Sequence, residues 1–353
     1  LFSLIFRPVI LKRYFKRMIN KKITLKELAA ILKVSVSTVS KALNDSYEIS
    51  EATKKKVKTA AIKYNYSPNL LAQGLKTKKT KILGVIIPDM RAPFFIRVLR
   101  GIEKEASDQG YNILTCFSNE SYAKEKATLD MLSQGNVDGI IMALCKESQE
   151  KGHYDHVNEL ISKGIPVTLF DRIDDRIKCD KVVINDFEST YNATKVLIES
   201  GAKNILFISP ISTTSIGKDR YRGYSFALSE RKNISERVLH IEEYKDFSSD
   251  LNAVLENEKV DGIIAANELT GISAINIASR LGIKVPEEIS IIGFTNGLLS
   301  MNSNPPLTTI SQHGKDIGKV ATQKLINRLK NKKLEYSTTV IETTLIRRGT
   351  TKN

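Results

Sequence analysis

The spacing of apolar and polar positions predicts two short helices near the start of the chain. Leucine and alanine recur three or four residues apart over residues 25–32, and Thr24 and Glu27 have the spacing of a capping box. Ser35 is a candidate N-cap for a second helix over residues 36–43, which is polar on one side. Two short helices joined by a tight turn are typical of a helix-turn-helix, whose second helix enters the DNA major groove. A small helical bundle without a ligand would have the same pattern.

A third helix is predicted over residues 51–65, with Ser50 as its N-cap, and it completes a small three-helix core. Its apolar positions point inward, and Lys54 is expected on the outer face with the neighbouring lysines. The segment from Asn69 to Leu75 follows Pro68 and is too short to be stable as an isolated helix. We therefore expect a hinge segment that becomes helical only when a partner contacts and stabilises it.

From Ile82 onward, short apolar runs alternate with amphipathic helical stretches. The predicted strands cover residues 82–87, 112–117, 137–142, 166–170, 204–208, 260–266 and 289–294. The predicted helices cover residues 94–109, 122–133, 188–200, 220–231, 247–257 and 269–281. Strands that are apolar throughout and alternate with helices indicate parallel sheets covered on both faces. The fold class is therefore α/β behind a helical N-terminal domain.

The pentapeptide Val-Asp-Gly-Ile-Ile occurs twice, at residues 137–141 and 260–264, each time after a predicted helix. Together with the number of strands, this repeat predicts two similarly built lobes, each a doubly wound parallel sheet. Ligands of such sheets bind outside the carboxyl ends of the strands, and two facing lobes form a cleft that closes by hinging.

Charge changes the interpretation of the first helices. The chain has 54 Lys+Arg and 39 Asp+Glu, a net charge of +15, and residues 1–81 hold 19 of these bases but only 4 of the acids. The remaining residues are neutral overall, so the whole excess lies beside the predicted helix-turn-helix. Concentrated positive charge supplies the salt-dependent part of DNA affinity.

The sequence gives little indication of disulfides, metal sites, membrane-spanning helices or catalytic motifs. The three cysteines are far apart, which suggests no disulfide framework and fits a reducing cytosol. His153 and His156 have no convincing metal-binding neighbours and are interpreted as surface residues. No apolar run approaches the roughly 20 residues that a membrane-spanning helix needs. The phosphate-binding, nucleophile-elbow and zinc-protease motifs are absent, so we expect neither an enzyme nor a cofactor or metal.

The first residues fit none of these elements. Residues 1–17 contain a short apolar stretch that lacks the order of a secretory signal, and the chain starts with Leu1. Met18 lies just before the first helix, so we expect translation to start there.

In this order the motifs resemble the lactose-repressor (LacI) family of bacterial transcription regulators. The resemblance spans nearly all of residues 20–350, and its motifs are ITLKELA, VSVSTVSKALN, YSPNLLAQGL, GVIIPD, FDR, RYRGY, VPEEISIIGF and PPLTTISQ. It implies a periplasmic-binding-protein-like core behind the DNA-binding domain. The implied division is 1–19 extension, 20–66 helix-turn-helix domain, 67–80 hinge helix and linker, and 81–353 core. Within the core, the N-lobe is expected at about 81–182 and 311–335, and the C-lobe at about 183–310 and 336–348.

The resemblance assigns roles in DNA binding. Base reading falls to Val36, Ser37 and Lys41, which the helical pattern also places on the polar face. Contacts to the DNA backbone are implied for Ser35, Thr38, Asn44, Ser50 and Thr53. The hinge positions that order in the minor groove are Asn69, Ala72, Gln73 and Leu75, with Leu75 as the wedge that kinks the duplex. The wedge acts together with the same residue of a second chain, so the resemblance implies a homodimer on a pseudo-palindromic double-stranded operator.

The resemblance also implies a small effector between the lobes, often a sugar, a sugar derivative or a nucleobase. The matched positions are Asp89, Phe94, Phe95, Arg172, Arg220, Phe247, Asn267 and Thr295. Two positions depart from the family pattern. Thr295 stands where members commonly have Asp, which leaves the effector class open. Lys33 stands where the turn usually has a small residue, so that turn is either slightly strained or does not need a positive φ.

The sequence thus predicts a cytoplasmic DNA-binding transcription regulator, of the repressor type, that is controlled by an effector and has no membrane partner. A periplasmic-type solute-binding protein is the alternative, against which the basic helical domain and the missing signal sequence argue. An enzyme on a doubly wound fold is a third interpretation, which the absent motifs disfavour.

Overall fold

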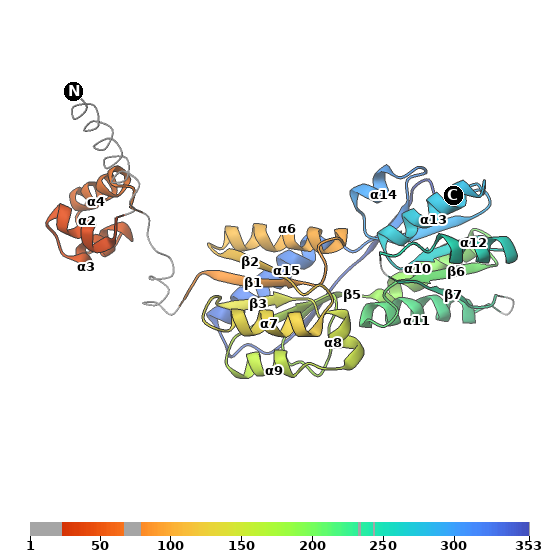
Figure 1. The fold of residues 1–353 in the computed structure, drawn as a ribbon, viewed down its shortest axis with the longest axis horizontal. Coiled ribbons are helices and arrows are strands. Elements are labelled where there is room, and N and C mark those ends of the chain that lie inside the picture. Colours follow the sequence, from red (N-terminus) through yellow and green to blue (C-terminus); the bar gives the residue numbers. More distant parts are fainter. Residues whose placement is uncertain (1–22, 67–78, 232–233, 243, 353) are drawn as a thin grey trace, which may run out of the picture. The chain divides into compact units, whose positions relative to one another are not determined.

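The computed structural model describes residues 23–66, 79–231, 234–242 and 244–352 (Figure 1). The expected N-terminal extension and the hinge positions Asn69, Ala72, Gln73 and Leu75 lie outside these residues. The chain divides into two units, Leu1–Thr80 and Lys81–Asn353, which we call the head and the core.

Three helices form the described part of the head: α2 (Leu25–Leu32), α3 (Val36–Leu43) and α4 (Glu51–Lys63). Their apolar faces meet in a small core whose buried members are Leu28, Ala29, Val39, Ala42, Val57, Ala60 and Ala61. The helix pattern predicted from the sequence is confirmed, with the third helix ending two residues earlier than expected.

The three predicted N-caps of the head are also confirmed. The side chain of Thr24 accepts from the Glu27 amide at 3.2 Å, and the Thr24 amide donates to the Glu27 carboxylate at 2.7 Å, which completes the capping box. Ser35 caps α3 and Ser50 caps α4 in the same way, with amide-to-oxygen distances of 3.0 and 3.4 Å.

One prediction for α4 is wrong. Lys54 is not on the exposed face but is buried, with only 8% of its surface exposed. Its ammonium group donates to the Glu51 carboxylate at 2.7 Å. The long apolar stem of a lysine can cover a hydrophobic core while its charged end reaches a partner near the surface.

The turn between α2 and α3 requires a positive φ, which the sequence left open. Lys33 ends α2 in the left-handed conformation, with φ 54° and ψ 41°. Its amide donates to the Ala30 carbonyl, and the Val34 amide donates to the Ala29 carbonyl at 3.1 Å. A residue with a Cβ atom is strained in this conformation, whereas glycine is not.

The core contains two six-stranded sheets, which lie in separate lobes (Figure 1). The N-lobe sheet is parallel throughout and has the order β11-β5-β4-β3-β1-β2. Its strands are β1 (Ile82–Ile87), β2 (Asn112–Phe117), β3 (Gly139–Met142), β4 (Val167–Phe170), β5 (Asp180–Ile184) and β11 (Thr338–Ile341). Its helices are α6 (Pro93–Asp108), α7 (Tyr122–Leu132), α8 (Lys146–Lys151), α9 (Asp155–Ser162) and α15 (Gly314–Lys330).

The C-lobe sheet has the order β12-β10-β9-β8-β6-β7, and only β12 is antiparallel to its neighbour. Its strands are β6 (Ile205–Ser209), β7 (Arg237–His240), β8 (Gly262–Ala265), β9 (Ser290–Phe294), β10 (Thr308–Ser311) and β12 (Thr344–Ile346). Its helices are α10 (Asp186–Glu199), α11 (Ser215–Ser229), α12 (Ser248–Asn257), α13 (Glu268–Arg280) and α14 (Leu298–Asn302).

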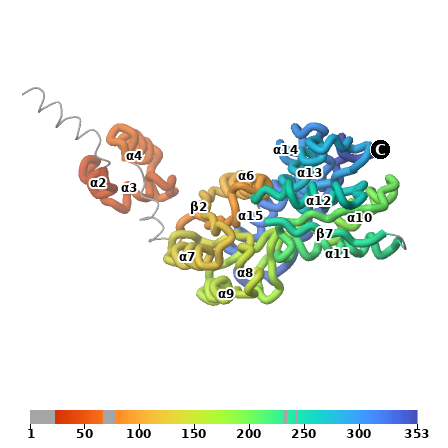
Figure 2. Tube along the Cα trace, turned by 45° about the vertical axis from the view of Figure 1, so that its right-hand side comes forward, coloured from red at the N-terminus to blue at the C-terminus, as the bar shows by residue number. Residues whose placement is uncertain are grey.

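Both sheets are covered on both faces, as the apolar runs predicted. In β1, Leu83, Val85 and Ile87 join the cluster that contains α6 and α15, whereas Ile86 joins the cluster that contains α7 and α9. The C-lobe sheet is likewise covered by α10 and α11 on one face and by α12 and α13 on the other. Figure 2 shows the same helices along the Cα trace from a second direction. A strand without a solvent-exposed face does not alternate between apolar and polar residues, so its sequence is apolar throughout.

The repeated pentapeptide has the same structure and makes the same kind of hydrogen bonds in each lobe. Its glycine and isoleucines form β3 in one sheet and β8 in the other, at equivalent places in the strand order. The aspartate that precedes each strand accepts hydrogen bonds at the start of the neighbouring one. Asp138 accepts from the Lys81 amide at 3.1 Å, and Asp261 accepts from the Lys203 and Asn204 amides at 2.9 and 2.7 Å.

The chain passes between the lobes after β5, after β10 and after β11. The last crossing corrects a predicted boundary. Residues 336–348 were assigned to the C-lobe, but β11 pairs in parallel with β5 of the N-lobe, and only β12 returns to the other sheet. The two strands are short and partly exposed, so their sequence carries no apolar run that would assign them to a lobe.

We predict that Lys33→Gly stabilises the head by about 0.5–1 kcal/mol, because glycine removes the cost of the left-handed backbone. Amide hydrogen exchange in α4 reports opening of the head separately from the core. Lys33→Ala is the control, since it removes the same charge but keeps a Cβ atom. Equal exchange rates in the two variants would contradict the prediction.

Candidate functional site

The exposed face of α3 carries the three predicted base-reading residues. Val36, Ser37 and Lys41 are exposed, whereas Val39 and Ala42 are buried in the head core. The orientation follows from the helical spacing, because residues 36, 37 and 41 lie on the side of α3 away from α2 and α4. This face offers hydroxyl and ammonium groups beside an apolar side chain, which are suitable groups for base edges in a major groove.

The five residues predicted to contact the DNA backbone lie at the ends of α3 and at the start of α4. Ser35 and Ser50 hold the first turns of α3 and α4, and Thr38 and Thr53 bond these cap hydroxyls at 2.8 and 3.0 Å. Asn44 donates from its side chain to the Ser40 carbonyl at 3.0 Å. Their contacts with phosphate remain predictions.

A second candidate site lies where the carboxyl ends of strands from both lobes meet. Its central residue is Arg220 of α11, which is 2% exposed. The Nε atom donates to Asp186 Oδ1 at 2.7 Å, and the Nη1 atom donates to the Ala266 carbonyl at 2.5 Å. The guanidinium group lies over the Phe294 ring, 3.7 Å from its centroid. The last three residues come from the ends of β5, β8 and β9.

Asp171 approaches this arginine from the other lobe. It follows β4, has a positive φ of 59° and is 4% exposed. Burial raises the pKa of Asp171, and the charges of Arg220 and Arg172 oppose that rise. Asp171 Oδ2 and Arg220 Nη2 are both buried and make no hydrogen bond to protein. Buried polar atoms are normally satisfied, so this acceptor and this donor are available to a polar ligand.

The N-lobe side of the cluster contains Arg172, Phe95 and Asp89. Arg172 forms an ion pair with Glu120 at 2.7 Å, and its guanidinium carbon is 5.5 Å from the centroid of the Phe95 ring. Burial tends to raise the pKa of Asp89, but hydrogen bonds from Arg91 lower it overall. Arg91 also lies over the ring of Tyr244 in the C-lobe, 3.9 Å from the centroid.

One side-chain amide joins the lobes directly. Gln149 of α8 donates to the Ser215 hydroxyl at 3.0 Å, and its Oε1 atom accepts from the Ser215 amide at 3.2 Å. Ser215 begins α11, the helix that carries Arg220. The contact therefore ties the arginine-bearing helix of the C-lobe to the N-lobe.

The other predicted effector residues have different surroundings. Phe94 packs against Phe95 with a centroid distance of 5.4 Å. Asn267 caps α13 by accepting from the Thr270 amide. Thr295 has a positive φ of 75° and donates its hydroxyl to Gln312 Oε1 at 2.7 Å. Phe247 packs in the apolar cluster beneath α12 and α13. Their contacts with an effector remain predictions.

Sequence reasoning missed several polar residues of the cluster, among them Asp171, Asp186 and Gln149. Asp171 directly precedes Arg172, and Asp186 follows the apolar end of β5, so both had the signal of a carboxylate after a buried strand. Gln149 had no signal, because its partner is 66 residues away in the sequence.

The interpretation of His156 as a surface residue is wrong. It is 5% exposed and bonds Glu125 Oε1 at 2.8 Å. Glu125 is fully buried and also accepts from the Ser148 hydroxyl at 2.6 Å and from the Cys145 amide at 2.7 Å. The network holds the start of α8 and so supports the position of Gln149. His153 is exposed, as expected.

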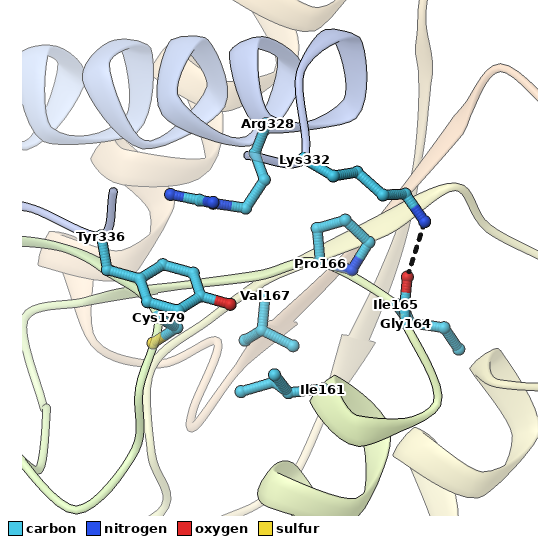
Figure 3. A pocket seen from close by; sticks show the side chains of 9 residues that line it. All are labelled: Ile161, Gly164, Ile165, Pro166, Val167, Cys179, Arg328, Lys332 and Tyr336. Carbon is cyan, nitrogen blue, oxygen red and sulfur yellow. Dashed lines mark hydrogen bonds between the residues drawn. The ribbon is translucent and has the colours of Figure 1, made fainter. Parts of the chain in front are cut away.

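A pocket of about 150 Å³ lies at the opposite end of the N-lobe sheet (Figure 3). Pro166 and Val167 line it at the start of β4, whereas Arg172 follows the end of that strand. Lys332 donates to the carbonyl of Gly164, another lining residue, at 3.2 Å (Figure 3). None of the predicted effector residues lines this pocket.

Within the described ranges, no group of three or more His, Cys, Asp or Glu side chains has the arrangement of a metal site. Among these same residues, no helix has the length and apolar content needed to cross a membrane.

Comparison with known proteins covers both units. Residues 24–69 match the model of bacterial regulatory proteins of the lacI family, and residues 194–351 match a periplasmic binding protein-like domain. The transcriptional regulator RegA of Clostridium saccharobutylicum is 32% identical and aligns with 93% of this chain and 99% of its own. The transcriptional repressor PurR of Aliivibrio fischeri is 31% identical, with coverages of 94% and 98%.

Solved structures agree in fold. The Lac repressor dimer bound to operator and an anti-inducer has a TM-score of 0.82 at 20% identity, with 94% of this chain and 99% of that chain covered. A LacI-family regulator from Enterococcus faecium with bound ribose has a TM-score of 0.69 at 25% identity, with coverages of 76% and 98%.

We predict that Asp186 makes the stability of the core depend on pH. Burial raises its pKa to about 7 despite the opposing charge of Arg220. Between its ordinary pKa of 3.8 and this value, the unfolded chain releases a proton that the folded core keeps. The contribution of Asp186 to the free energy of unfolding therefore falls as the pH rises through this window and is constant above it.

Urea unfolding of the full chain at several pH values between 5 and 8 tests this. Asp186→Asn cannot titrate, so it should gain stability relative to the wild type as the pH rises. Asp250→Asn is the control, because it removes an exposed carboxylate of the same lobe that is not among the charges acting on Asp186. Parallel stability curves for wild type and Asp186→Asn would exclude titration of Asp186.

Proposed function

The chain belongs to the lacI family of bacterial regulatory proteins, and we propose that it is a homodimeric repressor whose operator affinity is set by a small polar effector bound between the lobes. The family consists of transcription regulators rather than enzymes. A solute-binding protein would need only the core, so the helix-turn-helix head favours the regulator.

DNA binding by the head is supported by its helices and its charge. Val36, Ser37 and Lys41 read base edges, while Ser35, Thr38, Asn44, Ser50 and Thr53 contact the backbone. The excess of basic residues in the first 81 adds affinity for any DNA through counterion release. The hinge positions Asn69, Ala72, Gln73 and Leu75 enter the minor groove, and two copies of the chain present two heads to a pseudo-palindromic site.

The observation that carries the effector proposal is the pair of unsatisfied buried groups at the lobe junction. Arg220 Nη2 can donate and Asp171 Oδ2 can accept, and they come from different lobes. A sugar or sugar derivative offers hydroxyl groups that do both. The ribose in the Enterococcus regulator supports this ligand class. Asp89, Phe94, Phe95, Arg172, Phe247, Asn267 and Thr295 complete the proposed site.

A ligand held from both lobes can control the arrangement of the lobes. It stabilises whichever arrangement lets both groups bind it, and it shifts the equilibrium by its difference in affinity between the two states. The contact between Gln149 and Ser215 lies beside the same junction and is made in one arrangement of α8 and α11. Operator affinity changes when the effector moves the lobes and, through them, the spacing of the hinges.

Selection of genomic fragments by the purified full chain tests the DNA proposal. We expect an enriched inverted repeat whose affinity falls steeply as salt increases, because phosphate contacts release counterions. Failure to retain any genomic fragment at low salt would exclude a DNA-binding regulator.

We predict that Arg220→Lys weakens effector binding at least tenfold while it leaves effector-free operator affinity within about twofold. Lysine keeps the positive charge but has one nitrogen in place of three, so it cannot reach Asp186, the Ala266 carbonyl and a ligand at once. A hydrogen bond to a charged group contributes about 1.5–3 kcal/mol. Thermal shifts with ribose and a panel of other pentoses and hexoses identify a ligand, and titration gives the affinity.

Arg222→Lys is the matched control, because Arg222 is an exposed arginine of the same helix. If both variants bind the sugar as the wild type does, Arg220 does not hold the effector. If no sugar in the panel shifts the wild-type transition, the sugar class itself is wrong.

A further inference from the structure

The turn that follows α3 places an acidic residue beside the base-reading face. The ammonium group of Lys41 donates to the carboxylate of Glu48, and both side chains are 47% exposed. The turn itself folds back onto the end of the helix, because the Ser46 amide donates to the Lys41 carbonyl at 3.0 Å. Glu48 is thereby held at the edge of the surface formed by Val36, Ser37 and Lys41.

This ion pair contributes little to the stability of the head. Exposed pairs are typically worth less than about 1 kcal/mol, because water solvates both charges and two long side chains lose freedom. The head is already held by its buried core and by three N-caps. Glu48 therefore has no structural task that requires a carboxylate.

A carboxylate at a DNA interface is unfavourable unless it accepts hydrogen bonds, because the phosphates surround it with negative potential. The bond from Lys41 satisfies only part of the acceptor capacity of Glu48. In the major groove the donors are the N4 amino group of cytosine and the N6 amino group of adenine. Lysine, in contrast, donates to O6 and N7 of guanine. A G·C pair presents the acceptors of guanine and the amino group of cytosine side by side across one base pair.

We propose that Lys41 and Glu48 together read one G·C base pair, with Lys41 donating to guanine and Glu48 accepting from cytosine. The proposal rests on the proposed function, since it assumes that α3 enters the major groove. It adds Glu48 to the specificity-determining residues and assigns the base pair that the lysine reads. A lysine alone can bind other acceptors, and the carboxylate removes that freedom because it is repelled wherever no amino group faces it.

The test is selection of binding sites from a random double-stranded DNA library by the full-length wild type, Glu48→Gln and Lys41→Gln. We expect one strongly preferred G·C pair in each half-site of the wild type. Glu48→Gln should lower discrimination at that pair by about tenfold, because glutamine can donate as well as accept and so tolerates base pairs that the carboxylate rejects. Discrimination at one base pair is typically worth about 1–3 kcal/mol. Lys41→Gln should lower discrimination at the same pair and at no other.

Asp45→Asn is the matched control for charge. Asp45 lies in the same turn and pairs with Lys58 at 2.5 Å, so the variant also removes one exposed carboxylate from an ion pair. We expect it to raise affinity for all DNA sequences similarly and to keep the preferred bases. Circular dichroism of each variant verifies that the head remains helical.

The outcomes separate this inference from the function on which it rests. A wild type that enriches no motif would refute the proposed function. A wild type with a clear motif that Glu48→Gln reproduces with equal discrimination would refute the role of Glu48. Uniformly tighter binding of Glu48→Gln to all sequences, as with Asp45→Asn, would also overturn it, because Glu48 would then only reduce net charge.

Discussion

The core is organised by one constraint: parallel strands that are buried on both faces must end at a common edge. Their amides and carbonyls are satisfied within the sheet, and helices cover the apolar side chains above and below. Central strands such as β1, β3 and β8 are therefore apolar throughout, and charged residues collect where such strands end. In this chain the carboxyl ends of the two sheets provide Asp89, Asp171 and Asp186 along with the Ala266 carbonyl.

Charge balance then determines which contacts are made at that edge. A buried guanidinium group is very costly unless a carboxylate neutralises it. The two buried guanidinium groups at this edge are those of Arg220, which pairs with Asp186, and Arg172, which pairs with Glu120. At the exposed Arg91 the buried partner is the carboxylate of Asp89. Asp171 has no pair of its own, and it faces Arg220 across the junction. The junction is therefore electrostatically sensitive to anything that donates hydrogen bonds to Asp171, which is a property suited to a ligand-controlled switch.

The head depends on local interactions instead. Each helix is short, so its first turn is held by a capping hydroxyl and its inner face by a few small residues. Because so little is buried, the outer face of α3 is free to carry residues chosen for contact rather than packing. The strained Lys33 and the exposed pair of Lys41 and Glu48 show that this surface is not optimised for stability alone.

The sequence by itself determined the elements with strong periodicity. The three head helices, their caps and seven core strands follow from residue spacing. The apolar positions of each of these elements can be recognised within its own short stretch of sequence. The repeated pentapeptide also revealed two similar lobes, since the same hydrogen bonds are needed at the same place in each sheet. The family resemblance supplied Arg220 and Arg172, which the structure places among buried charges at the lobe junction.

Only the tertiary structure decided features that join distant parts of the chain. The short strands β5, β7 and β11 lack a continuous apolar run, and β11 belongs to the N-lobe only because β5 offers it an edge. Asp171 and Arg220, whose charges interact, are far apart in the sequence, and so are Gln149 and Ser215, whose side chains bond, so neither pairing had a local signal. His156 was misplaced for the same reason, because Glu125 is 31 residues away in the sequence. Lys54 was misplaced although Glu51 is only three residues away, because its burial follows from the packing of the three head helices. A polar residue is buried when a partner is present, and partners are brought by the fold.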